Sequence, residues 1–292
     1  MRSENRVGFQ SATLAFVFWG LLPIYWKFMK SVPAEEVLSH RIIWSAIFVY
    51  LILLFQRRTS ELWDALKDKR TVINMIGSGL LIGTNWFTYI WAVNHNMVLE
   101  TSLGYFICPM LSVLLGFFFL KEKIRGFMIP ALVFVGTAIA IMTLGYGQFP
   151  FAGVTLAVSF GFYGLFRKKV QVKPLPGLFI ETLTLVPIAL GYLIYVHVKG
   201  GGAFMNLLPE TYYLIGSGVA TSLPLLLYVA GANRIRLGTL GTLQYIGPSI
   251  AFFIGIFMYH EPIGLSKLAS FVLIWIGVVL YLMQLYRDAK HV

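Results

Sequence analysis

The fold is decided by the stretch at residues 77–124, GSGLLIGTNWFTYIWAVNHNMVLETSLGYFICPMLSVLLGFFFLKEKI, and its copy at 216–263, GSGVATSLPLLLYVAGANRIRLGTLGTLQYIGPSIAFFIGIFMYHEPI. The copy follows at a constant offset of 139 residues (216 minus 77), and 11 of the 48 positions are identical. Chance matching at this apolar composition would give about four. Such repeats in a hydrophobic chain are typical of secondary transporters, whose two structural repeats enclose a substrate site near the bilayer midplane.

The composition predicts an all-α integral membrane protein. Of 292 residues 58% are apolar and 12% charged, and the mean hydropathy is +0.77, whereas soluble domains are about 25% charged. A membrane-spanning helix needs about 20 apolar residues. Windows of that length predict ten transmembrane helices at 8–29, 36–55, 72–93, 99–120, 126–145, 151–167, 176–196, 211–232, 238–259 and 266–285. They divide into two five-helix repeats, residues 1–147 and 148–292.

The basic residues predict the orientation of these helices. Eighteen Lys and Arg residues fall in segments on one side of the predicted membrane, whereas the other side carries only Lys27, Lys30, Lys199 and Lys267. The positive-inside rule therefore places both termini in the cytoplasm. Because five spans is an odd number, the second repeat is inverted relative to the first. The net charge of +11 thus reflects topology, and we expect no nucleic-acid partner.

The sequence lacks the motifs of the common enzyme and metal sites. Cys108 is the single cysteine, which excludes an internal disulfide or a thiolate cluster. There is no G-x-x-x-x-G-K-[ST] loop, no H-E-x-x-H helix and no G-x-S-x-G elbow. We therefore expect no catalytic residues, no metal and no cofactor. An enzyme remains a distant alternative because His40 and Glu181 are both predicted to be buried.

Polar side chains at helical spacing predict a cavity wall on four spans. Tyr105 and Pro109 share a face of the fourth span, and Gln244 and Pro248 share the equivalent face of the ninth. Asn85 and Tyr89 lie on the third span, and Tyr228 lies on the eighth. Helix packing is the alternative for these stripes. The matched prolines predict either paired hinges or static kinks.

Three ionisable residues lie deep in predicted spans, where charge is costly and usually functional. His40 and Arg41 lie in the second span and Glu181 in the seventh. Arg41 either pairs with Glu35 or Glu36 at the interface or faces the cavity and binds a carboxylate or phosphate. Glu181 is either a proton acceptor or a structural partner for Arg41, a tyrosine or the backbone. For Glu122 and Glu261 at span ends we expect helix capping or rim ion pairs.

Six stretches resemble a known family of membrane proteins. They are EEVLSHRIIWS at 35–45, NWFTYIWAVN at 85–94, ETSLGYF at 100–106, FYGLFRKK at 162–169, IETLTLVP at 180–187 and TLGTLQYIGP at 239–248. Over nearly the whole chain, the sequence is similar to the ten-span drug/metabolite transporters of the EamA type, and within them to the RarD family. One departure is Cys108, because members often have Asn immediately before this proline.

The resemblance implies a multi-pass secondary transporter of the inner membrane that exports small metabolites or drugs. It places a central pocket between spans 1, 3, 4, 6, 8 and 9. On this chain that pocket contains Trp19, Asn85, Trp86, Tyr89, Tyr105, Tyr163, Tyr228, Gln244 and Tyr245. We expect a zwitterionic or uncharged small molecule as substrate and the lipid bilayer as the other partner. A passive channel remains the main alternative, and the oligomeric state, including a monomer, stays open.

Overall fold

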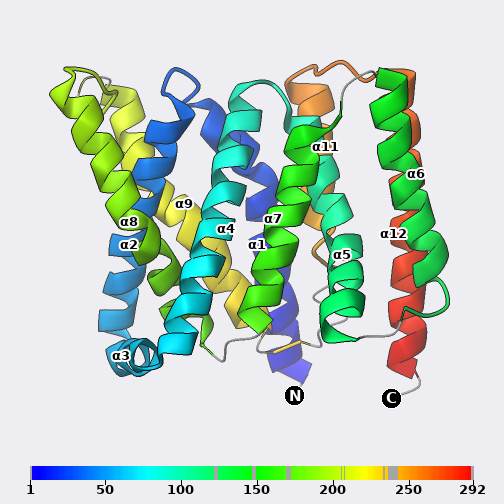
Figure 1. Ribbon diagram of the computed structural model, residues 1–292, viewed down its shortest axis with the longest axis horizontal. Coiled ribbons are helices and arrows are strands. Elements are labelled where there is room, and N and C mark those ends of the chain that lie inside the picture. Colours follow the sequence, from blue (N-terminus) through cyan, green and yellow to red (C-terminus); the bar gives the residue numbers. More distant parts are fainter. Residues whose placement is uncertain are drawn as a thin grey trace.

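The computed structural model is all-helical over the residues that it describes, which are 2–121, 124–146, 149–168, 172–204, 206, 208–232, 234–235 and 243–290. Figure 1 shows the helices side by side in one bundle. They are α1 (Arg2–Lys27), α2 (Ala34–Phe55), α3 (Thr59–Lys67), α4 (Lys69–Asn94), α5 (Val98–Leu120), α6 (Met128–Tyr146), α7 (Phe151–Lys168), α8 (Pro174–Val198), α9 (Leu208–Ala232), α11 (Ile246–Phe253), η1 (Ile254–Met258, a π-helical turn) and α12 (Leu265–Lys290).

Each of the ten apolar windows overlaps a helix of the structure. The window at 238–259 is covered from Ile246 onward by α11 and η1, and residues 236–242 lie outside the described part of the chain. Pro248 therefore falls in the first turn of α11, where a missing N–H breaks no intrahelical bond. Pro109 instead lies inside α5. The sequence did not predict α3, a short helix that buries Leu62 and exposes Trp63.

Several helices are long and apolar enough to span a membrane. Within the described residues five meet this test by length and composition, namely Arg6–Lys27, Ala34–Phe55, Val98–Phe119, Leu175–Val198 and Leu265–Gln284. Three shorter apolar helices are Met128–Leu144, Phe151–Arg167 and Ile246–Met258. Long lipid-exposed helices tolerate few polar groups, whereas α4 buries Ser78, Asn85 and Thr88 inside the protein. These features are those of a multi-pass membrane protein.

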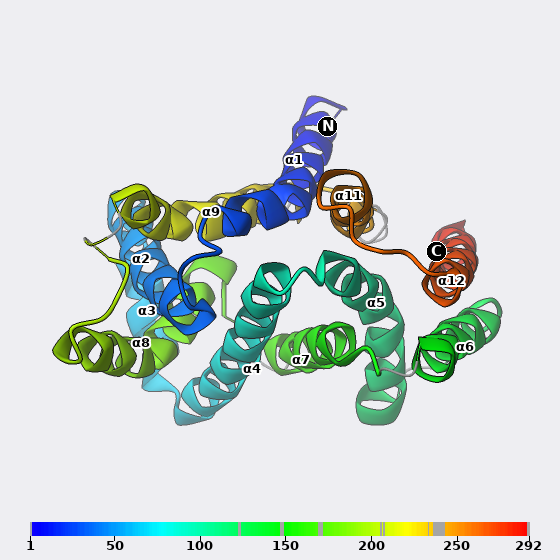
Figure 2. The ribbon, with the colours of Figure 1, turned by 90° about the horizontal axis from the view of Figure 1, so that it is seen from above.

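The helices pack in matched pairs. Helix α1 packs on α9 and α11, α7 packs on α4 and α5, α2 packs on α4 and α9, and α8 packs on α4. Three further contacts join α2 to α8, α5 to α11 and α6 to α12. Viewed from above in Figure 2, α7 lies between α4 and α5, and the α6–α12 pair stands at one side of the molecule.

The Gly-Ser-Gly repeat lies at two close helix crossings. A Cβ on Gly79 would lie 3.1 Å from the Glu181 carbonyl oxygen, so α4 and α8 approach through this glycine. A Cβ on Gly218 would lie 2.6 Å from the backbone of Trp44, so α9 and α2 likewise approach closely through this glycine. Small residues let transmembrane backbones come this close. The repeated motif is therefore explained by packing at both crossings.

The two ends of the bundle are distinct. The N-terminus and C-terminus lie at the same end of the bundle as α3 (Figure 1). At the opposite end the Glu261 carboxylate accepts hydrogen bonds from the N–H groups of Val98 (2.7 Å) and Leu99 (2.9 Å). These two donors are otherwise unpaired in the first turn of α5. The capping role predicted for Glu261 is confirmed, whereas Glu122 lies outside the described residues.

Candidate functional site

Arg41 lies between two tryptophan rings in the interior of the bundle. Its Cζ atom is 4.3 Å from the ring centroid of Trp86 and 4.9 Å from that of Trp26. The Arg41 Nε–H donates to Thr221 Oγ1 at 2.9 Å, so one bond ties α2 to α9. Only 5% of Arg41 is exposed. Cation–π contact of this kind stabilises a guanidinium that has lost its water.

The charge of Arg41 has no counter-ion within the part of the chain that the structure describes. The ion pairs found there join Arg58 and Lys173 to Glu61, Lys67 to Asp64, and Arg167 to Glu181. The Nη1 atom of Arg41 is buried and makes no hydrogen bond. A buried guanidinium with a free donor is costly unless an anion satisfies it. The arrangement therefore suits a ligand that brings an anionic oxygen.

The interfacial interpretation of Arg41 is wrong, because its expected partners are engaged elsewhere or exposed. The Glu36 carboxylate is buried and accepts from the backbone N–H of Ala203 at 2.6 Å and of Phe204 at 3.2 Å. It thereby fixes the loop that leads into α9. Glu35 is exposed. His40 stacks on Phe204 with ring centroids 4.6 Å apart and an unbonded Nε2.

Asn85 positions a tyrosine next to this guanidinium. The Asn85 Nδ2 group donates to the Leu156 carbonyl at 3.0 Å and to Ser159 Oγ at 3.1 Å, and Tyr105 OH donates to Asn85 Oδ1 at 3.2 Å. The amide thus joins α4, α5 and α7. Tyr105 lies within electrostatic range of Arg41. Asn85 therefore orients the site through Tyr105.

A row of aromatic rings connects the Arg41 region with Glu181. Tyr89 and Tyr105 have ring centroids 5.8 Å apart, Tyr105 and Phe160 6.3 Å, and Phe160 and Tyr163 5.6 Å. The Tyr163 hydroxyl donates to Glu181 Oε2 at 3.4 Å. The row supplies apolar area with polar tips between the two buried charges, which is the composition of a site for a small organic molecule.

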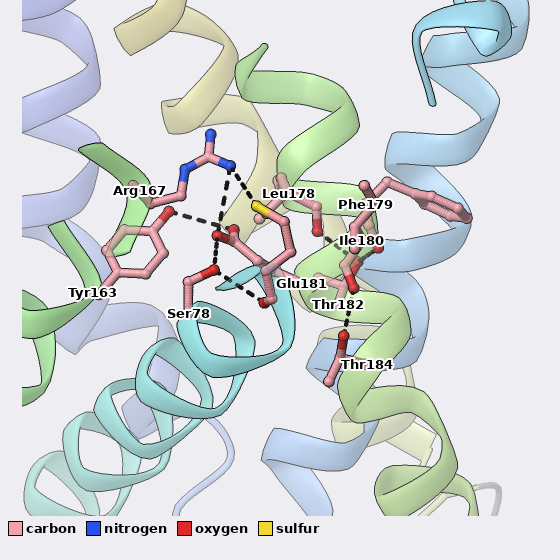
Figure 3. A network of polar contacts seen from close by, with 10 residues as sticks. Ser78, Tyr163, Arg167, Leu178, Phe179, Ile180, Glu181, Thr182 and Thr184 are labelled. Atoms are coloured by element: carbon pink, nitrogen blue, oxygen red, sulfur yellow. Dashed lines mark hydrogen bonds and ion pairs between the residues drawn. The ribbon is translucent and has the colours of Figure 1, made fainter. Parts of the chain in front are cut away.

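Glu181 joins three helices through its carboxylate, as Figure 3 shows. Ser78 Oγ from α4 donates to Glu181 Oε1 at 2.7 Å. Arg167 Nη1 from α7 lies 3.7 Å from the same oxygen and donates to Met75 Sδ at 3.5 Å. Only 1% of Glu181 is exposed, whereas 19% of the Arg167 side chain is. Arg167 is therefore a partly solvated cation that pairs with the buried Glu181 carboxylate.

Sequence reasoning missed Arg167 because the charge count assigned it to a loop. It is the second-last residue of α7, and its guanidinium reaches the Glu181 carboxylate of α8. A Cβ on Gly177 in the first turn of α8 would collide with Arg167 Nη1, so this glycine leaves the space for it. The signal was present as a glycine one turn before Glu181, on the same face of α8.

The other predicted site residues do not join one cluster. Trp19 and Tyr228 pack on each other at 5.6 Å, between α1 and α9. Tyr245 stacks on Phe106 at 6.0 Å, on the side of α5 that packs on α12. Gln244 lies in the turn that precedes α11. The residues that share the Arg41 neighbourhood are Trp86, Tyr89, Asn85 and Tyr105, and sequence reasoning omitted Trp26 from it.

Comparison with known proteins identifies the family. The family model described as the EamA-like transporter family matches residues 6–144 and again residues 150–283. The chain belongs to the EamA-like transporter family. The predicted resemblance is confirmed, and the family's description indicates a transporter rather than an enzyme.

Relatives of this EamA-like transporter are found in several bacteria. "Uncharacterized transporter YojE" of Bacillus subtilis (strain 168) is 42% identical over 284 residues, covering 96% of this chain and 94% of that protein. "Protein RarD" of Escherichia coli (strain K12) is 37% identical over 287 residues, covering 96% and 95%. A chain described as "Crystal structure of protein" shares the fold with a TM-score of 0.62 and 18% identity, covering 98% of this chain and 99% of that one.

Proposed function

We propose that this EamA-like transporter is a gradient-driven secondary transporter that exports a small organic molecule. The observation that carries the proposal is Arg41, a buried guanidinium held between Trp26 and Trp86 with an unbonded Nη1. A purely structural arginine would be expected to have its donors satisfied. The free donor and the aromatic row beside it support a ligand site inside the bundle.

The proposed architecture is ten spans in two inverted repeats, residues 1–147 and 148–292. The 139-residue repeat supports it, and so does the packing of the helices. Exchanging α1 with α7, α2 with α8, α4 with α9 and α5 with α11 maps the most extensive helix contacts onto one another: α1–α9 onto α7–α4, α1–α11 onto α7–α5, and α2–α9 onto α8–α4. A twofold axis that passes through the α2–α8, α5–α11 and α6–α12 contacts would exchange the helices in this way.

The proposed orientation has both termini in the cytoplasm of a cell whose inner membrane holds the protein. Arg57, Arg58, Lys67, Lys69 and Arg70 surround α3 at the end where both termini lie (Figure 1). The positive-inside rule supports a cytoplasmic location for that end. Export then means that substrate enters from the α3 end and leaves at the end that carries Glu261.

The charges favour a zwitterion or an uncharged amphiphile as substrate. Arg41 offers one planar donor group that a single carboxylate satisfies. A polyanion such as a sugar nucleotide would need several convergent cations. Of the described residues around this site, Arg41 is the cation and Tyr89, Tyr105 and Trp86 supply phenols and ring faces. Aromatic rings bind planar or cationic parts of a ligand.

Transport assays test this proposal. Comparing the metabolites of cells with and without the protein identifies candidate substrates, which are then assayed in proteoliposomes containing the full chain. Accumulation against a concentration gradient, abolished by a protonophore, supports secondary transport. Equilibration without accumulation would support the passive channel, and covalent conversion of a substrate would support an enzyme.

A further inference from the structure

We propose that Glu181 is a proton-binding site, and that its protonation releases Arg167 and unlocks the α4–α7–α8 junction at the α3 end of the protein. The inference rests on the proposed function, because it names the ion whose gradient drives transport and the residues that bind and respond to that ion. In the structure the junction is closed, since the carboxylate contacts α4 through Ser78 and α7 through Arg167 and Tyr163 (Figure 3).

The contacts around Glu181 suit an ionised carboxylate. A carboxylate has two oxygens that only accept, and here they face the hydroxyls of Ser78 and Tyr163 and the guanidinium of Arg167. Protonation converts one oxygen into a hydroxyl and the pair Glu181–Arg167 from net zero to net +1. Arg167 then has no counter-ion among the described residues. Because its side chain is already partly solvated, it can turn outward to water.

A proton fits this site and a metal cation does not. Arg167 Nη1 lies 3.7 Å from the carboxylate, where its charge would repel a bound cation. Within the described residues no three His, Cys, Asp or Glu side chains gather as a metal site. The hydroxyls of Thr182 and Thr184 bond carbonyls inside α8, so this segment is regular helix without free carbonyl ligands (Figure 3). Sodium sites in transporters use unwound backbone.

The other charged and titratable groups that face α8 have partners of their own or lie away from the Glu181 carboxylate. At the start of α8, Lys173 donates to Glu61 of α3 at 2.7 Å. From α2, Tyr50 stacks on Phe179, and Glu35 and Glu36 lie near Tyr192 toward the other end of the helix. From α9, Tyr228 is within electrostatic range of Tyr163. Among the residues that the structure describes, the titratable groups that contact the Glu181 carboxylate directly are therefore Arg167 and Tyr163.

The position of Glu181 suits alternating access. It is the eighth residue of α8 (181 minus 174 is 7 steps), and Arg41 is the eighth residue of α2 (41 minus 34 is 7 steps). At 1.5 Å per residue each lies about 10 Å from the start of its helix, at opposite ends of the bundle. The aromatic row connects the two. A proton at one end can thus control access to a ligand at the other.

A labelling experiment without substrate tests the junction. Met75 is fully buried there, so Met75→Cys in the Cys108→Ser full chain is labelled only when the junction opens. Inside-out membrane vesicles are treated with an impermeant maleimide at neutral and mildly acidic pH. Because acid also slows maleimide addition by reducing thiolate, each rate is divided by that of Ser60→Cys on the exposed face of α3.

The relative rate at Met75→Cys is expected to rise on the order of tenfold on acidification, the population change for losing one bond to a charged group. Adding Glu181→Gln, which mimics the protonated acid, should make the rate high and independent of pH. Adding Gly177→Ala, which displaces Arg167 without changing a charge, should raise the rate at neutral pH. Glu181→Asp retains a carboxylate and should retain the pH response.

The outcomes separate this inference from the proposed function. A pH response that persists in Glu181→Gln would overturn the assignment, and so would a wild-type rate that does not change with pH. If Glu181→Gln fails to fold, the Gly177→Ala and Glu181→Asp results decide in its place. Wild-type proteoliposomes that accumulate substrate without any dependence on the proton gradient would overturn the coupling alone. Wild-type proteoliposomes that transport nothing would overturn the proposed function.

Discussion

Replacing Arg41 with methionine distinguishes a ligand-binding arginine from a structural one. The substitution keeps an unbranched, flexible side chain beside Trp26 and Trp86 while removing the guanidinium, its charge and its bond to Thr221. Replacing even a paired buried charge and its partner with apolar residues of similar volume often leaves stability unchanged or raises it by about 1–4 kcal/mol, and an unpaired buried charge is more costly to keep. The structure favours this outcome because Arg41 has no acidic partner among the described residues and one free donor. We expect Arg41→Met to unfold at the same temperature as wild type or higher.

The same substitution should strongly weaken binding of a carboxylate ligand. A hydrogen bond to a charged group contributes about 1.5–3 kcal/mol, which is about 10- to 150-fold in affinity. Arg41→Lys should lose nearly as much, since a lysine ammonium cannot form the planar paired contact. Thermal unfolding in detergent and initial rates in proteoliposomes measure the two properties, with Arg58→Lys, at a partly exposed arginine that pairs with Glu61, as control. Full transport by Arg41→Met, or a large fall in its unfolding temperature, would refute the reasoning.

Three further predictions concern the scaffold. Asn85→Ala removes three hydrogen bonds between helices, and at about 0.6 kcal/mol each in membranes it should lower the free energy of unfolding by about 2 kcal/mol, measured by denaturation in mixed micelles. Gly218→Ala should destabilise by about 1–3 kcal/mol, whereas Gly136→Ala, with nothing within 4 Å, should not; equal unfolding temperatures would contradict this. Cysteine at position 58, in a Cys108-free chain, should react with impermeant reagents only from the cytoplasmic side, and labelling from outside would exclude the proposed topology.

The helices could be predicted from the sequence because their signals are local. Apolar windows need only composition, and all ten overlap helices of the structure. Helix α3 was missed because it is short and amphipathic, with Leu62 buried and Trp63 exposed. Such a helix gives no long apolar run.

The candidate site was only partly predictable because its contacts join distant segments. Depth in a span identified Arg41 and Glu181, and periodicity identified Asn85 and Tyr105. Neither signal says which side chains meet. The Glu36 carboxylate bonds a loop 167 residues away in the sequence. Arg167 reaches Glu181 only because its side chain passes Gly177, which a count of loop charges cannot detect.

The most direct test of secondary transport is uptake of an identified substrate into proteoliposomes with and without an imposed proton gradient. We predict that the wild-type chain accumulates substrate above the external concentration only while the gradient lasts, and that Arg41→Met shows no accumulation while remaining folded. Uptake that stops at equal concentrations on both sides, whatever the gradient, would contradict secondary transport and indicate a passive channel.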